Sequence, residues 1–407
     1  MKTKLKPFEY LKWSSSFLKV GYCLTALPHF SYWAMKLTRP LYANGENFLN
    51  RKIRWAFLTL GGGILPPEEI KAYRYGVKAF VDNMDTSMNA EKNGKPIVWA
   101  EWILSSEIVG AFDAVAFNPE TLNVFGNMSG QDVPALLMEE AESAGFATEY
   151  CSAIKLTAGA YMLGQSPQPT AILAGSHPCD TNVSAYQGIA HLTGAPVFYL
   201  DAPYWRDEDS FKYYEKNMWD MVAFLEKSLH QKINWDKLKR IVDNENKFNF
   251  YLHEICEMMR ATPCPSTMIT PLFAWVVREL AIGDPNATEM TRIMYEVVKD
   301  RFEKGKGVVK KENIRVLWWN PPIAFFTYIF KWMENEFGAV VVRDFLGDVQ
   351  AQQVDTSSEK DMIRELSRNH LFLAMARQCH GPVEFITSEL EKAIDEYSAD
   401  CLIFAGH

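Results

Sequence analysis

The chain has 407 residues, 48% of them apolar, and a formal net charge of −8. This length and composition allow large buried cores and suggest two or three domains. The acidic balance argues against a protein that binds nucleic acid through phosphate contacts. No run of about 18 uninterrupted apolar residues marks a transmembrane helix. We expect a cytoplasmic protein, because no secretion signal is recognisable and the cysteine usage disfavours disulfides.

Residues 1–95 are predicted to be mainly helical. In LPPEEIKAYRYGVKAFVDNMDTSMN, prolines precede acidic residues, and apolar positions follow at helical spacing. The preceding TLGGG lacks the Gly-Lys-Ser/Thr ending of a phosphate loop, so we interpret it as a turn. The many aromatic residues among the first 60 suit a contact with a partner or with another domain.

Residues 96–206 are predicted to form a first α/β domain. The strand-like segments PIVWAEW, TAILAGS and APVFYLDAPYW are separated by helical segments, PALLMEEAESAG and NVSAYQGIAHLTG. Strands that alternate with helices favour a parallel sheet. Residues 207–311 then show apolar side chains at i, i+3 and i+4, which predicts a helical segment.

Residues 312–407 are predicted to form a second α/β domain. Its strands are IRVLWWNPP, AVVVRDF and DCLIFAGH, and Gly338 closes the helix FFTYIFKWMENEFG between the first two. The fold class is therefore α/β, with two doubly wound parallel-sheet domains of Rossmann or flavodoxin type. Such sheets bind ligands at the carboxyl ends of their strands. The sequence stops at such an end, so we expect that this domain is truncated after His407.

The seven cysteines are odd in number and lie in a long chain without a recognisable secretion signal, which disfavours disulfides. Each cysteine is then either a small apolar side chain in a core, or a residue that binds a metal or takes part in redox chemistry. We interpret Cys401 as part of the core, inside an apolar strand. Cys23, Cys256 and Cys264 are interpreted as structural.

Cys179 lies between the strand TAILAG and the following helix. A helix N-terminus is expected to lower the pKa of a thiol, and the thiolate is the form that binds a metal. A small buried residue in a tight turn is an equally good interpretation of the position alone. Cys151 lies 28 residues earlier, and the two thiols could meet at one edge of the sheet. Their spacing is not that of a zinc ribbon or a ferredoxin.

Three weaker candidates remain. Cys379 lies in a Gly-Pro turn beside a histidine, where loop packing is the simpler interpretation. His177 and His407 end predicted strands and are candidates for contact with a substrate or cofactor. We find no Ser-His-Asp order, no HExxH and no GxGxxG that would indicate another chemistry. No catalytic residue is assigned.

Four segments in this order resemble the family of 2-hydroxyacyl-CoA dehydratases and benzoyl-CoA reductases, whose members include the D-component of 2-hydroxyglutaryl-CoA dehydratase. They are AESAGFATEYCSAIK, PTAILAGSHPCDTNVSAYQGIAHLTGAPVFYLDAPY, RVLWWNPPIAFFTYIFKWMENEFGAVVV and LEKAIDEYSADCLIFAGH. The resemblance covers about residues 75 to 407.

The resemblance implies an anaerobic iron–sulfur enzyme subunit with a [4Fe-4S] cluster held by three cysteines. Cys151 and Cys179 match two of these ligands. The third would follow FAGH, where the sequence ends, or Cys379 would supply it, alone or as part of a double-cubane cluster. The resemblance also implies an oligomer with a homologous second subunit or a homodimer, an ATP-dependent iron–sulfur activator, and an acyl-CoA substrate.

Three functions remain open at this point. The chain is a subunit that acts on acyl-CoA thioesters, as a lyase that removes water or as an oxidoreductase that reduces an aromatic ring. Alternatively, it is a non-catalytic electron-relay or scaffold subunit, or a double-cubane-cluster reductase of the same family. The third alternative is a zinc or thiol protein without a cluster.

Overall fold

The computed structural model describes residues 6–27, 29, 67–104, 106–121, 133–320, 328–347 and 352–405. The predicted Gly-rich turn, most of the aromatic-rich N-terminal stretch and His407 lie outside these residues. The chain divides into two compact units. Unit 1 comprises Met1–Ser16, Val81–Asp243 and Gln353–Pro382, and unit 2 comprises Phe17–Phe80, Asn244–Gln352 and Val383–His407.

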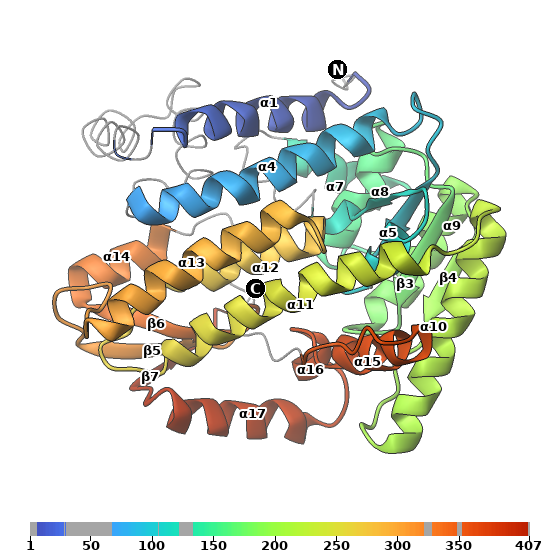
Figure 1. Ribbon diagram of the computed structural model, residues 1–407. Helices are drawn as coiled ribbons and strands as arrows, with labels where there is room; N and C mark the ends of the chain where they lie inside the picture. The colour runs from blue at the N-terminus through green and yellow to red at the C-terminus, as the bar shows by residue number, and fades with distance from the viewer. Residues whose placement is uncertain are drawn as a thin grey trace. The chain divides into compact units, whose positions relative to one another are not determined.

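Unit 1 contains a sheet of four parallel strands in the order β2-β1-β3-β4. The strands β3 and β4 are labelled in Figure 1. The strands are β1 (Ile97–Ala100), β2 (Val115–Phe117), β3 (Ala171–Gly175) and β4 (Val197–Leu200). The three strands predicted from the sequence are confirmed. The short strand β2 was not predicted, because its three residues carry too little pattern.

The helices of unit 1 cover both faces of this sheet. On one face, Trp99 of β1 packs edge-on against Tyr161 of α8, with ring centroids 5.8 Å apart. On the other face, Val98 joins an apolar cluster with Met218 of α10 and Ile363 of α15. The helices are α5 (Ser106–Gly110), α7 (Val133–Ser143), α8 (Ser152–Met162), α9 (Asp180–Thr193), α10 (Glu208–Leu229), α15 (Glu359–Leu371) and α16 (Ala376–Cys379).

Unit 2 contains three parallel strands in the order β6-β5-β7. They are β5 (Ile314–Trp318), β6 (Ala339–Asp344) and β7 (Cys401–Ile403). Its helices are α12 (Ile269–Ala281), α13 (Pro285–Glu303), α14 (Tyr328–Phe337) and α17 (Val383–Glu396). The α/β class and its parallel strands are confirmed, and the doubly wound arrangement stays a prediction.

Three helices contribute residues to both units: α1 (Glu9–Leu24), α4 (Pro67–Asn89) and α11 (Trp235–Met258). The helices predicted within residues 207–311 are present as α10 to α13, and they are divided between the units. Gly338 ends α14 with a φ of 62°, as the sequence indicates, because glycine adopts this left-handed conformation without steric cost.

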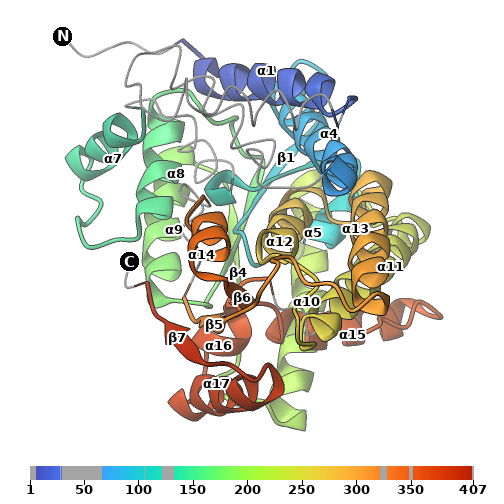
Figure 2. The same cartoon turned by 90° about the vertical axis from the view of Figure 1, so that its left-hand side faces the viewer.

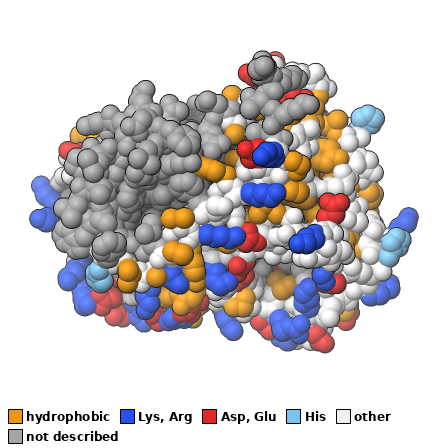
Figure 3. Space-filling view, turned by 90° about the horizontal axis from the view of Figure 1, so that it is seen from above, with side chains coloured by type: hydrophobic (Ala, Val, Ile, Leu, Met, Phe, Trp, Pro, Cys, Tyr) orange, Lys and Arg blue, Asp and Glu red, His pale blue; other side chains and the backbone are white. Residues whose placement is uncertain are grey.

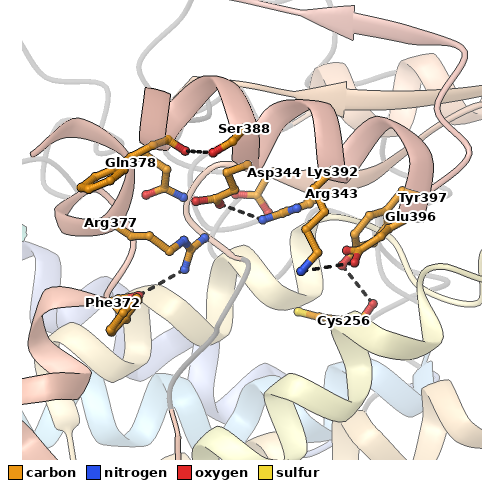
Figure 4. A network of polar contacts seen from close by, with 12 residues as sticks. Cys256, Arg343, Asp344, Phe372, Arg377, Gln378, Ser388, Lys392, Glu396 and Tyr397 are labelled. Carbon is orange, nitrogen blue, oxygen red and sulfur yellow. Dashed lines mark hydrogen bonds and ion pairs between the residues drawn. The ribbon is translucent and has the colours of Figure 1, made fainter. Parts of the chain in front are cut away.

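Two cysteines in unit 2 are structural, as predicted. Cys256 is buried, and its thiol donates to the carbonyl oxygen of Gly347 at 3.5 Å. Its own carbonyl oxygen accepts a hydrogen bond from the Tyr397 hydroxyl at 3.3 Å (Figure 4). Cys264 is also buried, and its thiol donates to the carbonyl oxygen of Ser266. These thiols therefore act as small apolar side chains with one weak donor.

The interpretation of Cys401 as a core residue is wrong. Cys401 is exposed, and Leu402 and Phe404 are 44% and 67% exposed. The reason is topological, because β7 is an edge strand of the three-stranded sheet and pairs with β5 alone. Cys23 is likewise exposed, on α1, and fills no core.

Within the residues that the structure describes, no helix is both long and apolar enough to cross a membrane. The face drawn in Figure 3 carries basic and acidic side chains interspersed among the described residues. That part of the surface has no extended field of one sign to attract a polyanion.

The packing of α7 against α8 yields a first prediction. A Cβ at Gly159 would lie 1.9 Å from the carbonyl oxygen of Leu137, which is backbone and cannot turn away. Gly159→Ala should therefore destabilise the protein by about 1–3 kcal/mol, as overpacking does, in urea unfolding. Gly188→Ala is the matched control, because its Cβ would meet the Phe146 ring at 3.1 Å and a side chain can shift. An equal effect of both substitutions would contradict this interpretation.

Candidate functional site

The direction in which the chain adds strands to the sheet of unit 1 reverses between β1 and β3, and such a place is called a topological switch point. The chain leaves β1 toward β2 on one side and leaves β3 toward β4 on the other, although β1 and β3 are paired. Glu101 directly follows β1, and residues 176–179 directly follow β3. Parallel α/β sheets bind ligands at such points, outside the carboxyl ends of the strands. This edge is therefore the candidate site.

Cys151 and Cys179 occupy equivalent positions at this edge. Each is the N-cap residue of a helix, Cys151 of α8 and Cys179 of α9. The two helices pack side by side (Figure 2), and both cysteines are exposed. The sequence predicts that they lie at one edge of the sheet, and the electrostatic effect of Cys151 on Cys179 supports this. Their role as metal ligands stays a prediction.

The surroundings of Cys179 oppose formation of its thiolate. Burial of the sulfur raises the pKa of Cys179 to about 11, and Glu101, Cys151 and Glu120 raise it further. The backbone N–H of Asn182 lowers it in part. The lowering expected at a helix N-terminus is thus present through the Asn182 N–H, but burial and nearby acidic groups outweigh it, so the pKa of Cys179 is raised in the metal-free chain.

Two buried glutamates lie behind the thiols. Glu101, which is fully buried, accepts a hydrogen bond from the side-chain amide of Asn182 at 2.9 Å. Glu120 accepts from the Tyr186 hydroxyl at 2.8 Å and from the Trp102 backbone N–H at 3.0 Å. Burial raises the pKa of Glu120 to about 7, although both donors lower it. This carboxyl group is thus balanced between its two protonation states near neutral pH.

Sequence reasoning missed both glutamates. Glu101 could have been found, because a carboxylate directly after the buried strand IVWA is a common sign of a site at a sheet edge. Glu120 could not, because it follows β2, which the sequence did not reveal. Asn182, which is also buried, lies in the first turn of α9. Its side chain contacts the thiol of Cys179, with 3.7 Å between the sulfur and Oδ1.

His177 lies two residues after the end of β3, close to its predicted position, but it is buried rather than on the surface of the edge. Among the described residues, neither of its ring nitrogens has a hydrogen-bond partner. Burial lowers the pKa of His177 to about 3, and the charges of His370, His380 and Arg206 lower it further. The imidazole is therefore neutral at physiological pH. Its contact with a substrate stays a prediction, and His407 lies outside the described residues.

Arg206 brings the segment around Cys379 to the edge near β4. Its guanidinium donates to the carbonyl oxygens of Ala376, Arg377 and His380 at 3.0, 2.8 and 3.2 Å. The His380 ring in turn contacts the Ala202 carbonyl oxygen, just after β4, at 3.1 Å. Cys379 ends α16 and is exposed. It is thus held by a segment that borders the same edge of the sheet.

The donors at this edge suit an iron–sulfur cluster in part. Two exposed thiols at adjacent helix N-termini are the right ligand type, since such clusters bind thiolates. Within the described part of the chain, however, no group of three or more His, Cys, Asp or Glu side chains is arranged to hold a metal ion. The described residues therefore provide two placed thiols and no complete ligand set.

Comparison with known proteins identifies a family for this chain. Residues 101–407 match the family of the 2-hydroxyglutaryl-CoA dehydratase D-component, and the chain belongs to this family. The resemblance found in the sequence is confirmed.

Two curated relatives are dehydratase subunits. The alpha subunit of (R)-phenyllactyl-CoA dehydratase from Clostridium sporogenes is 20% identical over 257 residues, which cover 60% of this chain and 62% of that subunit. The alpha subunit of (R)-2-hydroxyisocaproyl-CoA dehydratase from Clostridioides difficile is 21% identical over 238 residues, which cover 56% and 58%. The match thus spans about three fifths of each relative's length.

The raised pKa of Glu120 predicts how stability depends on pH. A folded-state pKa near 7, above the unfolded value of about 4.3, means that the folded chain holds this proton more tightly. The resulting stabilisation is present below about pH 4 and is lost as the pH rises through 7. Glu120→Gln should remove this dependence, so from pH 5 to pH 8 the wild type should lose about 2–3 kcal/mol relative to the variant.

Urea unfolding at several pH values measures this difference. Glu139→Gln, which neutralises an exposed glutamate on the neighbouring α7, is the control and should show no such trend. A pH-independent difference between the wild type and Glu120→Gln would show that Glu120 is ionised throughout this range.

Proposed function

We propose that this chain is the iron–sulfur subunit of a dehydratase that removes water from 2-hydroxyacyl-CoA thioesters. Membership of the D-component family supports the reaction class, and both curated relatives carry the name of an acyl-CoA dehydratase. The observation that carries the proposal is the placement of Cys151 and Cys179 as N-cap residues of two adjacent helices at the switch edge of the sheet.

In this proposal, Cys151 and Cys179 are two ligands of a [4Fe-4S] cluster. The third thiolate comes from Cys379, whose segment borders the same edge, or from a residue outside the described ranges. A bound cluster would supply one-electron chemistry and an iron that accepts a substrate oxygen. The chain itself contributes the buried layer of Glu101, Asn182 and Glu120, which orients the first turn of α9 and keeps water from the inner side of the thiols.

The proposed partners follow from the names of the relatives. Both are described as alpha subunits, so we propose that this chain pairs with a homologous subunit or with a second copy of itself. The low-potential electron would come from an ATP-dependent iron–sulfur activator in the cytoplasm. Reduction of an aromatic acyl-CoA, as in benzoyl-CoA reductases, would use the same cluster and electron source.

A non-catalytic subunit, which relays electrons or acts as a scaffold, is the second candidate. The observation that favours the scaffold, although not the relay, is that the described residues form no group of three metal-ligating side chains. Calorimetry with a 2-hydroxyacyl-CoA distinguishes the candidates, because a catalytic subunit binds the thioester and a scaffold does not.

Loss of a proposed ligand should reduce bound iron without unfolding the chain. After anaerobic reconstitution, Cys179→Ser should contain at most about half the iron of the wild type, because serine replaces a thiolate with a poor iron ligand. The exposed N-cap position tolerates serine, so the circular dichroism should be unchanged. Cys401→Ser is the matched control, since Cys401 is an exposed thiol on β7. Equal iron in both variants would exclude Cys179 as a ligand.

The isolated chain should not turn over substrate. We expect no dehydration of 2-hydroxyacyl-CoA and no reduction of aromatic acyl-CoA thioesters under anaerobic conditions with a strong chemical reductant. Activity should appear only when a second subunit and the activator are added. Product analysis by chromatography measures this, and turnover by the chain alone would contradict the proposed division of labour.

A further inference from the structure

The two exposed thiols at the candidate site differ in what lies behind them. The third residue after Cys151 is Ile154, a buried apolar side chain in the first turn of α8. The third residue after Cys179 is Asn182, an amide that is 4% exposed in the first turn of α9. At this third position, the first thiol is therefore followed by an apolar side chain and the second by a polar one.

The orientation of the Asn182 amide is fixed by two acceptors. Its Nδ2 donates to Glu101 Oε1 at 2.9 Å and to the carbonyl oxygen of His177 at 3.4 Å. A backbone carbonyl oxygen can only accept, so the NH₂ group must face it and the amide oxygen must face the other way. That oxygen, Oδ1, faces the sulfur of Cys179 at 3.7 Å.

Tight packing prevents Glu101 from moving away. The residue is fully buried, and a Cβ placed at Gly175 would come within 3.2 Å of Glu101 Oε2. The carboxyl group thus lies beside β3, in space that the missing side chain of Gly175 leaves to it. Turning the amide of Asn182 would bring its oxygen against the oxygen of the His177 carbonyl group, which is unfavourable. We call this arrangement of Glu101, Asn182 and the His177 carbonyl the amide lock.

An amide oxygen that faces a sulfur suits a thiol but not a metal-bound thiolate. The thiol donates its hydrogen to Oδ1, whereas a thiolate can only accept and is repelled by that oxygen. To bind a metal, the sulfur of Cys179 must therefore rotate away from Asn182. Cys151 has Ile154 in the corresponding place and requires no such change.

We propose that Asn182 is a positioning residue that holds Cys179 in its metal-free orientation, so that Cys151 binds an incoming metal first and Cys179 follows. The inference rests on the proposed function only where it names these thiols as ligands. Partners of metal ligands beyond the first coordination shell commonly change metal affinity by 10- to 100-fold.

Alkylation of the metal-free chain tests the lock. Iodoacetamide is added under anaerobic conditions, and the labelling of Cys151 and Cys179 is followed by peptide mass spectrometry at several pH values. We expect Cys151 to react about tenfold faster or more. The double variant Glu101→Leu with Asn182→Leu removes the donor, the acceptor and the buried charge together, and Cys179 should then approach the rate of Cys151.

Two further variants separate the lock from the charge of Glu101. Glu101→Gln removes the charge, which raises the pKa of Cys179, but it retains an oxygen that can accept from Asn182. The ratio of the two rates should therefore change much less than in the double variant. Ser184→Ala, on the exposed side of α9, should also leave the ratio unchanged. Equal rates in the wild type, an unchanged ratio in the double variant, or a large change in Glu101→Gln would each overturn the lock.

A measurement on the unmodified chain tests the order of binding without any variant. Substoichiometric Co²⁺ is added before the alkylating reagent, and protection is mapped by residue. We expect protection of Cys151 at lower Co²⁺ than protection of Cys179, and simultaneous or reversed protection would overturn the order. The iron content of Cys179→Ser tests the proposed function separately. The lock can thus fail while Cys179 remains a ligand, and the reverse also holds.

Discussion

The parallel pairing of β1 with β3 determines where the candidate residues of unit 1 lie. Both strands are buried along their whole length, so polar side chains are excluded from the strands and collect where the strands end. Glu101 and residues 176–179 are brought together there, although more than 70 residues separate them in the sequence. Because polar groups at such a buried edge must be paired, the side chains of Asn182 and Tyr186 on α9 provide donors to the two glutamates.

This pairing requirement explains why the pKa of Cys179 is raised, although a helix N-terminus by itself would lower it. A helix N-terminus stabilises an anion by a small amount, and this effect is short-ranged. The carboxyl groups behind the thiol act in the opposite direction, and the partial burial of the sulfur adds to them. The same residues that hold α9 against the sheet therefore keep the thiol protonated until a metal or another cation offsets their effect.

The sequence predicts helices and strands well where their apolar pattern is long and repeated. It predicts a contact less well when that contact depends on how the strands pair in the fold. The helices α10 and α11 and the strands β1, β3, β4, β5 and β6 follow from periodicity and from Gly and Pro signals. The thiols at Cys151 and Cys179 were found because each lies at an element end. Glu101 and Glu120 were missed, because their burial depends on strand pairing. Cys401 was misplaced, since an apolar strand at a sheet edge has the same local pattern as a central one.

The composition of unit 1 has a consequence for synthesis of the chain. Its apolar cluster includes Tyr214 and Met218 of α10 and also Ile363 and Leu366 of α15. One segment of unit 2, Asn244–Gln352, lies between these two helices in the sequence. When the ribosome has completed α10, the partners of these side chains are still more than 100 residues away. Until α15 has been synthesised, part of the apolar face of the sheet therefore stays exposed to solvent. A chaperone can bind this exposed face. For the same reason, no single proteolytic cut can release unit 1 as one continuous fragment.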